Sequence, residues 1–128
     1  MPKSTLTITT TVDGKETQIS PKGTLETDDE TIVINYHDGD SETQVSVKKD
    51  SATIVRRGDY GMALTLVKGE KTQGELTVSG SVGKIEIFTH LIEYSKKSNK
   101  YLITLRYDLL FGGEPQKMQV RIFAKNNG

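Results

Sequence analysis

Short runs in which apolar and polar residues alternate cover most of the chain, and this pattern restricts the fold more than any other feature. The first run places Leu6, Ile8 and Val12 on one face and threonines on the other, which is typical of a strand with one buried face. Asp13-Gly14 then supplies the left-handed backbone angles of a tight hairpin turn. The same succession of run and turn continues to the C-terminal end.

Nine or ten such runs follow one another at intervals of about a dozen residues, and none has the period of a helix. The run over residues 15–27 contains Pro21 and Gly23. Because proline donates no ladder hydrogen bond, we expect a bulge or corner there. The residues predicted to point inward from the later runs are Leu64, Leu66, Ile85, Ile87, Ile103, Leu105, Tyr107, Val120 and Ile122.

The connections between runs are short, so neighbours in the sequence are expected to be neighbours in the sheet. A long meander leaves two exposed edges unless it closes, and closure into a barrel removes both of them. The sequence therefore predicts one all-β domain over residues 1–128. We expect a single antiparallel meander closed into a barrel of about 8–10 strands, with a two-sheet sandwich as the alternative.

Composition narrows the classes of partner. Lys plus Arg and Asp plus Glu both number 17, so there is no net charge to attract nucleic acid or an anionic membrane. Cysteine is absent, which excludes thiol catalysis and disulfides. No apolar segment reaches the length of a signal peptide or a membrane span, and we predict a cytoplasmic protein that binds neither membranes nor nucleic acid.

The two histidines do not assemble into a recognisable catalytic or metal-binding motif. His37 stands beside Asp38 and Asp40, but Asp38-Gly39-Asp40 is more simply a hairpin turn whose carboxylates bond their own backbone. His90 has no nucleophile or orienting partner that the sequence identifies. We therefore predict no catalytic residue, no metal and no cofactor. The sequence leaves enzymatic activity open and favours a protein that is not an enzyme.

A family resemblance rests on single residues in a fixed order. They are Arg57-Gly58, then Met62, then Gly83 at the start of a long run through Thr89, then a run ending near Tyr107. In this order the chain resembles the small bacterial YwiB-like proteins. The likeness covers most of the chain and is strongest over residues 55–111. It implies a calycin-like barrel, the broad architecture of lipocalins, and it implies no activity.

Two hypotheses of function remain. In the first, the barrel binds a small apolar or amphipathic ligand in a cavity. The predicted lining consists of Tyr36, Met62, Thr89, Tyr101 and Tyr107, which would place a few polar groups among apolar side chains, as small-molecule pockets do. In the second, the barrel is filled by its own side chains and the protein acts through its outer surface as a structural or interaction subunit.

Three apolar residues are expected on the outside of the barrel. If Ile87 and Leu91 point inward, Phe88 and Ile92 point outward, and the last run places Phe123 outward as well. Several exposed apolar residues together usually mark an interaction surface. Because two-fold dimers are the commonest soluble assemblies, the sequence predicts a homodimer through these three residues.

Overall fold

Every regular element in the described part of the chain is a β-strand. The computed structural model describes residues 3–28 and 30–126, and eleven strands form all of the regular secondary structure within them. In chain order these are β1 (Lys3–Val12), β2 (Lys15–Ile19), β3 (Lys22–Thr27), β4 (Ile32–Asp38), β5 (Ser41–Val47), β6 (Ser51–Arg57), β7 (Tyr60–Val67), β8 (Lys71–Val78), β9 (Ser81–Lys97), β10 (Lys100–Leu110) and β11 (Gln116–Asn126). The described residues contain no helix that could cross a membrane.

Pairing between the last strand and the first closes the sheet. From β3 to β11, each strand pairs antiparallel with the next one along the chain. β11 then pairs with β1 from Ser4↔Asn126 to Val12↔Met118, and the first residues of β1 pair with β3. This ring confirms the predicted antiparallel barrel and sets aside the open sandwich. Ten of the strands form the ring, and β2 is an extra strand that pairs with β1.

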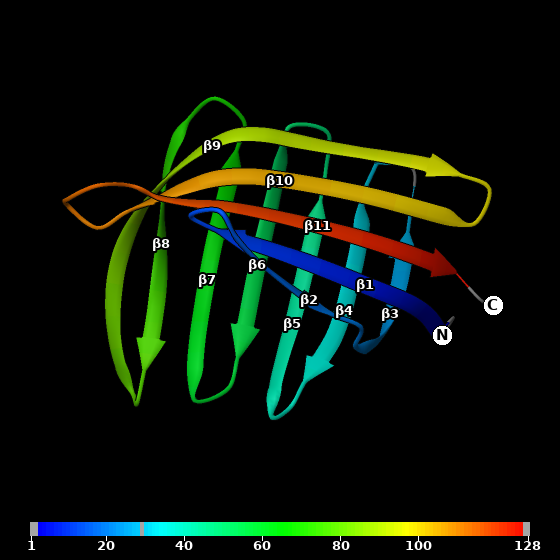
Figure 1. Ribbon diagram of the computed structural model, residues 1–128, viewed down its shortest axis with the longest axis horizontal. Coiled ribbons are helices and arrows are strands. Elements are labelled where there is room, and N and C mark those ends of the chain that lie inside the picture. The colour runs from blue at the N-terminus through cyan, green and yellow to red at the C-terminus, as the bar shows by residue number, and fades with distance from the viewer. Residues whose placement is uncertain (1–2, 29, 127–128) are drawn as a thin grey trace.

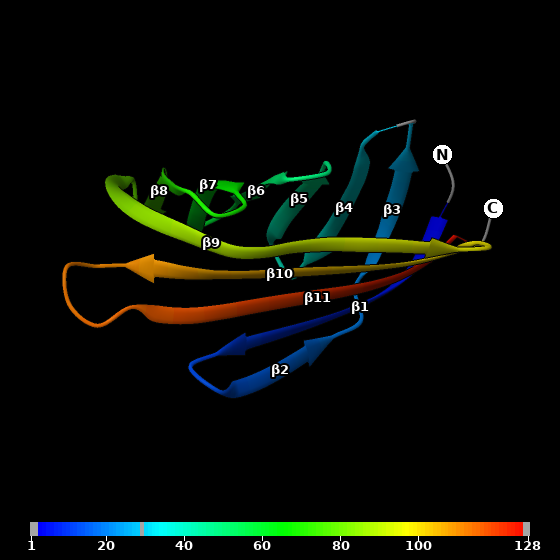
Figure 2. The ribbon, with the colours of Figure 1, turned by 90° about the horizontal axis from the view of Figure 1, so that it is seen from above.

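The barrel is flattened into two layers whose strands cross at a steep angle. Figure 1 shows β9, β10, β11 and β1 running across the front, with β3 to β8 behind them. In Figure 2, seen from above, the two layers are distinct and β2 lies on the outer side of the front layer. We call these the front layer and the back layer. The apolar core lies between them.

The sequence from 15 to 27 forms two strands because the chain turns a corner at Pro21. β2 ends at Ile19 and β3 begins at Lys22, which confirms the predicted corner. A side-chain carbon at Gly23 would lie 2.3 Å from the carbonyl oxygen of Asn35. Only glycine therefore allows β3 to approach β4 this closely as it leaves the corner.

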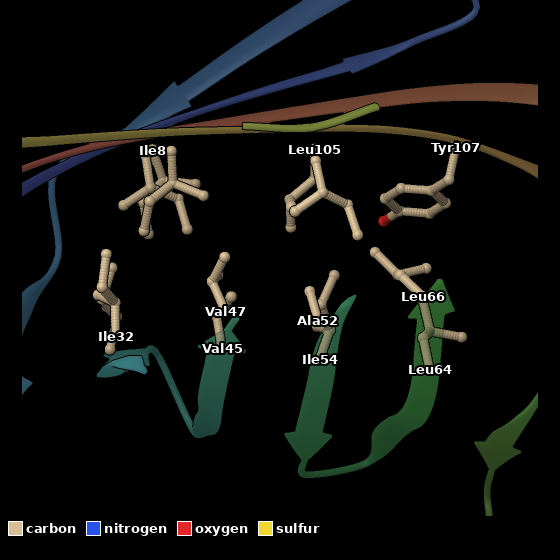
Figure 3. Close-up of a cluster of buried hydrophobic side chains, with 14 of the residues drawn as sticks. Ile8, Ile32, Val45, Val47, Ala52, Ile54, Leu64, Leu66, Leu105 and Tyr107 are labelled. Carbon is tan, nitrogen blue, oxygen red and sulfur yellow. The ribbon is translucent and has the colours of Figure 1, made fainter. Parts of the chain in front are cut away.

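The predicted inward face is the observed core. Of the nine residues predicted to point inward, all are buried except Val120, which is partly buried and packs against the others. Figure 3 shows Leu105 of the front layer opposite Ala52 and Ile54 of the back layer, and Tyr107 opposite Leu66 and Leu64. For these nine positions, alternation along the strand therefore identifies the interior face.

One predicted position is wrong, and a β-bulge is the reason. Thr89 pairs with Tyr107 whereas Leu91 pairs with Arg106, so β9 carries one extra residue at this point. An extra residue reverses the alternation of every side chain that follows it. As a result Ile92 is only 4% exposed, on the inner face rather than on the outer surface, and Leu91 is only partly buried.

Candidate ligand site at the barrel mouth

Inward-pointing side chains of the back layer form rows that cross the strands, and one row differs in chemistry from its neighbours. The row through the middle of the layer is apolar and fully buried: Leu25, Ile34, Val45, Ile54 and Leu64. The next inward row lies two residues away on each strand, later along β4, β6 and β8 and earlier along β5 and β7. Its members pair one after another across β4 to β8: Tyr36, Thr43, Arg56, Met62 and Leu76.

We call these the apolar row and the mouth row. The mouth row is the last complete inward row before the turns at Gly39-Asp40, Gly58-Asp59 and Ser79-Gly80. These turns lie at the lower end of the back layer in Figure 1. Thr43 is 3% exposed, whereas the other members are partly buried. The barrel therefore becomes polar and partly solvent-accessible at this end.

Arg56 is the charged member of the mouth row. Its Nη2 donates a hydrogen bond to Ser41 Oγ at 3.0 Å, and its guanidinium carbon lies 5.8 Å from the centre of the Tyr60 ring. Its Nε is buried and has no hydrogen-bond partner. The contacts between basic and acidic side chains in the described part of the chain are Lys71–Glu86 and His90–Asp108, so no carboxylate there lies within ion-pair distance of Arg56.

Two tyrosines lie at this end of the back layer, Tyr36 in the mouth row and Tyr60 beyond it, and a third, Tyr107, lies in the front layer. Tyr107 of β10 is 1% exposed, and burial raises its pKa, with smaller contributions from the neighbouring Tyr36 and Tyr60. Burial also raises the pKa of Tyr36, against the opposing effects of a hydrogen bond with Thr43 and the positive charge of Arg56, and the carboxylate of Asp38 adds a smaller rise. The contact of Arg56 with the Tyr60 ring, and the pairing of Thr43 with both Tyr36 and Arg56, place the guanidinium near two of these tyrosines.

Apolar side chains continue outward from the mouth row. Tyr60 and Val78 are paired across β7 and β8, two residues beyond Met62 and Leu76 on the same face. They are 44% and 52% exposed. Met118 of β11 lies opposite Tyr107 and is partly buried. The polar atoms of Arg56 and the tyrosines are thus flanked by apolar surface that water can reach.

Two of the five residues predicted to line a pocket, Tyr36 and Met62, belong to the mouth row. Tyr107 and Thr89 pair across β10 and β9, and the backbone of Thr89 bonds to Gly69 and Glu70 in the β7–β8 turn, at the opposite end of the back layer. Thr89 is fully buried and its Oγ1 has no hydrogen-bond partner. Tyr101 lies elsewhere: it lines a groove at the other end of β10 with Asp28 and Lys96.

Sequence reasoning missed Arg56, Thr43 and Tyr60 as parts of this site. For Arg56 the signal was present, because Ala52, Ile54 and Arg56 alternate along β6 and the first two are core residues. A charged residue that continues an inward-facing pattern is unusual, since arginine is rarely buried without a partner. The pairing of Arg56 with Thr43 and Met62 could not be predicted, because it depends on strand register.

The histidines do not form a second site with comparable features. His90 Nε2 lies 2.8 Å from Asp108 Oδ2 and its ring meets the Phe88 ring edge-on at 4.9 Å, all on the outer face of the front layer. His37 is exposed. No group of three or more potential metal ligands occurs among the described residues.

Comparisons with known proteins agree with this fold. A family model described as "Domain of unknown function (DUF1934)" matches residues 3–122. The crystal structure of the YwiB protein from Bacillus subtilis is similar over 99% of this chain and 93% of that chain, with a TM-score of 0.82 and 19% sequence identity. No curated protein matches. These findings confirm the resemblance to YwiB-like proteins, and at this identity the structural likeness concerns the fold alone.

Proposed function

The chain belongs to the DUF1934 family, whose function is unknown, and we propose that it binds a small anionic amphipathic molecule at the mouth of its barrel. The observation that carries the proposal is the guanidinium of Arg56, which is partly buried and has no carboxylate partner among the described residues. A charge removed from water is costly unless it is paired. A bound anion would supply the missing partner.

The surroundings of Arg56 favour a compact oxyanion such as a carboxylate. A guanidinium presents donors in a planar fork that matches two carboxylate oxygens. The buried Nε is one such donor without a partner. Because burial raises the pKa of Tyr36 and Tyr107, both hydroxyls keep their protons at neutral pH and remain able to donate a hydrogen bond to an anion.

The apolar part of the ligand would lie against Met62, Leu76, Val78 and Met118. These side chains are exposed or partly buried, and covering them would add hydrophobic stabilisation. The deeper interior is occupied by the apolar row and the front-layer residues that face it. We therefore place the ligand at the mouth, in contrast to a lipid enclosed along the whole barrel.

The test is calorimetric titration with decanoate, decyl phosphate and uncharged decanol. Arg56→Met should weaken binding of the anions by roughly tenfold or more, since a charge-assisted hydrogen bond contributes about 1.5–3 kcal/mol. The matched control is Arg57→Met, because Arg57 is adjacent but exposed. Equal affinity of Arg56→Met and the parent for an anion, or binding of none of the three compounds by the parent, would contradict the proposal. A stronger response to one of the anions identifies the head group.

A further inference from the structure

The second half of β9 extends beyond its neighbour β8. The pairing of β8 with β9 ends at Lys71↔Phe88, and the backbone of Gly69 and Glu70 then bonds to Thr89. Beyond the bulge, residues 91–97 pair with β10 on one side. On the other side the described residues provide no backbone partner. The structure therefore has an open strand edge over residues 91–97, in addition to the outer edge of β2, which pairs with β1 alone.

The hairpin that ends β9 shows which backbone groups are free. Lys97 and Lys100 flank the two-residue turn Ser98-Asn99, so they form a hydrogen-bonded pair. Alternation then directs the N–H and C=O groups of Ile92, Tyr94 and Lys96 away from β10. Figure 2 looks down on this edge, and no other ribbon passes in front of β9.

Apolar and charged side chains both accompany this edge. Tyr94 is 41% exposed and Leu102, on the neighbouring strand, is 36% exposed. Both line a groove of about 350 Å³ that separates the β9 edge from Lys49 in the β5–β6 turn. Glu93 and Lys97 lie on the same strand, four residues apart, so the edge carries both signs of charge.

We propose that the β9 edge pairs antiparallel with the same edge of a second copy of the chain, about a two-fold axis at Tyr94. In this register the free N–H and C=O groups of Ile92 face those of Lys96 of the partner subunit, and the two Tyr94 residues bond to each other. All seven residues from 91 to 97 take part. The front layers of the two copies become one continuous sheet.

Charge supports a second copy as the occupant. With the axis at Tyr94, Glu93 lies diagonally across from Lys97 of the partner subunit, within reach of long side chains. Lys96 and Lys97 lie across from apolar residues rather than from other lysines. Lysines commonly protect strand edges from unwanted pairing, but here Glu93, on the other side of Tyr94, offers an acidic partner for one specific register.

This interface differs from the one predicted from the sequence. That prediction used the outer face of the barrel, with Phe88, Ile92 and Phe123. Ile92 points inward, Phe88 is partly buried, and Phe123 is 40% exposed. A dimer through the outer face would depend on Phe88 and Phe123, whereas a dimer through the β9 edge would depend on Tyr94, Glu93 and Lys97. The two can be distinguished by substitution.

The experiment is sedimentation equilibrium of the full chain over a range of concentrations, with circular dichroism to confirm that each variant is folded. We expect the parent to dimerise at tens of micromolar. Glu93→Lys and Lys97→Glu should each weaken the dimer by roughly two- to thirtyfold, since two symmetric pairs change at once. The double exchange Glu93→Lys/Lys97→Glu should restore it. Tyr94→Lys, which puts like charges together on the axis, should give a folded monomer.

The outer-face alternative is tested by Phe88→Ser/Phe123→Ser. If the β9 edge is the interface, this variant remains dimeric. A parent that is monomeric at 100 μM would overturn the proposal. So would a dimer that the double phenylalanine variant dissociates while Tyr94→Lys does not, or single charge changes that the double exchange fails to rescue.

Discussion

The apolar row and the mouth row are built by the same strands, two residues apart, yet they differ in almost every physical property. Each member of the apolar row is at most 3% exposed, and none carries a polar side-chain atom. The mouth row contains a guanidinium with a buried unpartnered Nε, a tyrosine with a raised pKa and a buried threonine. The first row accounts for stability. The second contains groups that stability does not require.

The difference matters because polar groups in an interior are costly unless they are satisfied. An isolated buried donor costs about 1–3 kcal/mol relative to a satisfied one. A methionine or leucine at position 56 would avoid that cost and fit the alternation of β6. Retention of an arginine here is what would be expected of a site at which an external anion completes the hydrogen bonds.

The largest expected effect compares adjacent members of the two rows on β7. Leu64→Ala should lower the free energy of unfolding by about 2–5 kcal/mol, because it leaves a cavity in a filled core. Met62→Ala, two residues earlier, should cost about 1 kcal/mol, since its side chain is already partly in contact with water. Urea denaturation of both variants gives the comparison. If Met62→Ala were as destabilising as Leu64→Ala, the mouth would be part of the closed core and too tightly packed to receive a ligand.

A smaller effect compares two glycines at corresponding places in the rows. A side-chain carbon at Gly74 would lie 2.8 Å from the carbonyl oxygen of Ala63 and 2.9 Å from Leu64 Cδ2, whereas one at Gly83 would meet nothing within 4 Å. Gly74→Ala should therefore destabilise the protein by about 1–3 kcal/mol through overpacking.

Gly83 is the control, because it lacks a left-handed backbone angle. Gly83→Ala should be neutral or stabilise the protein by up to about 1 kcal/mol by restricting the unfolded chain. Thermal unfolding of the two variants is sufficient. A loss of stability at Gly83 comparable with that at Gly74 would show that this end of the sheet is less open than its geometry indicates.

The fold could be predicted from the sequence because strand alternation and turn residues are local signals. Asp13-Gly14, Pro21 and the run from Tyr101 to Leu109 each indicate structure without knowledge of distant residues. The bulge at His90 could not be predicted, since the alternation of Ile85, Ile87 and Thr89 gives no sign of an extra residue. That single residue moved Ile92 from the expected outer face to the interior.

Only part of the candidate site could be predicted from the sequence, because the site depends on the register between strands that are distant in the sequence. Tyr36 and Tyr107 could be named as inward-facing aromatics, but their proximity depends on the way the front layer crosses the back layer. Arg56 continues the inward pattern of Ala52 and Ile54 along β6. The two arginines point to opposite faces of β6, and only Arg56 enters the mouth row.

The smallest expected effect is the ionisation of the two tyrosines at alkaline pH, and it tests whether Arg56 acts on the mouth row as the geometry indicates. Burial raises the pKa of both Tyr36 and Tyr107. The folded state therefore keeps protons that the unfolded chain releases above about pH 10. It follows that stability falls as the pH rises above 10, and Tyr36→Phe or Tyr107→Phe should each reduce that fall.

Because the charge of Arg56 opposes the rise in the pKa of Tyr36, Arg56→Met should move the Tyr36 ionisation step to higher pH. Arg57→Met should move it less, since its side chain is exposed on the other face. Phenolate absorbance, with Tyr36→Phe to assign the step, measures both shifts. Equal shifts in the two variants would mean that Tyr36 responds to the overall charge of β6, and the mouth row would then lose its cation as a specific partner for an anion.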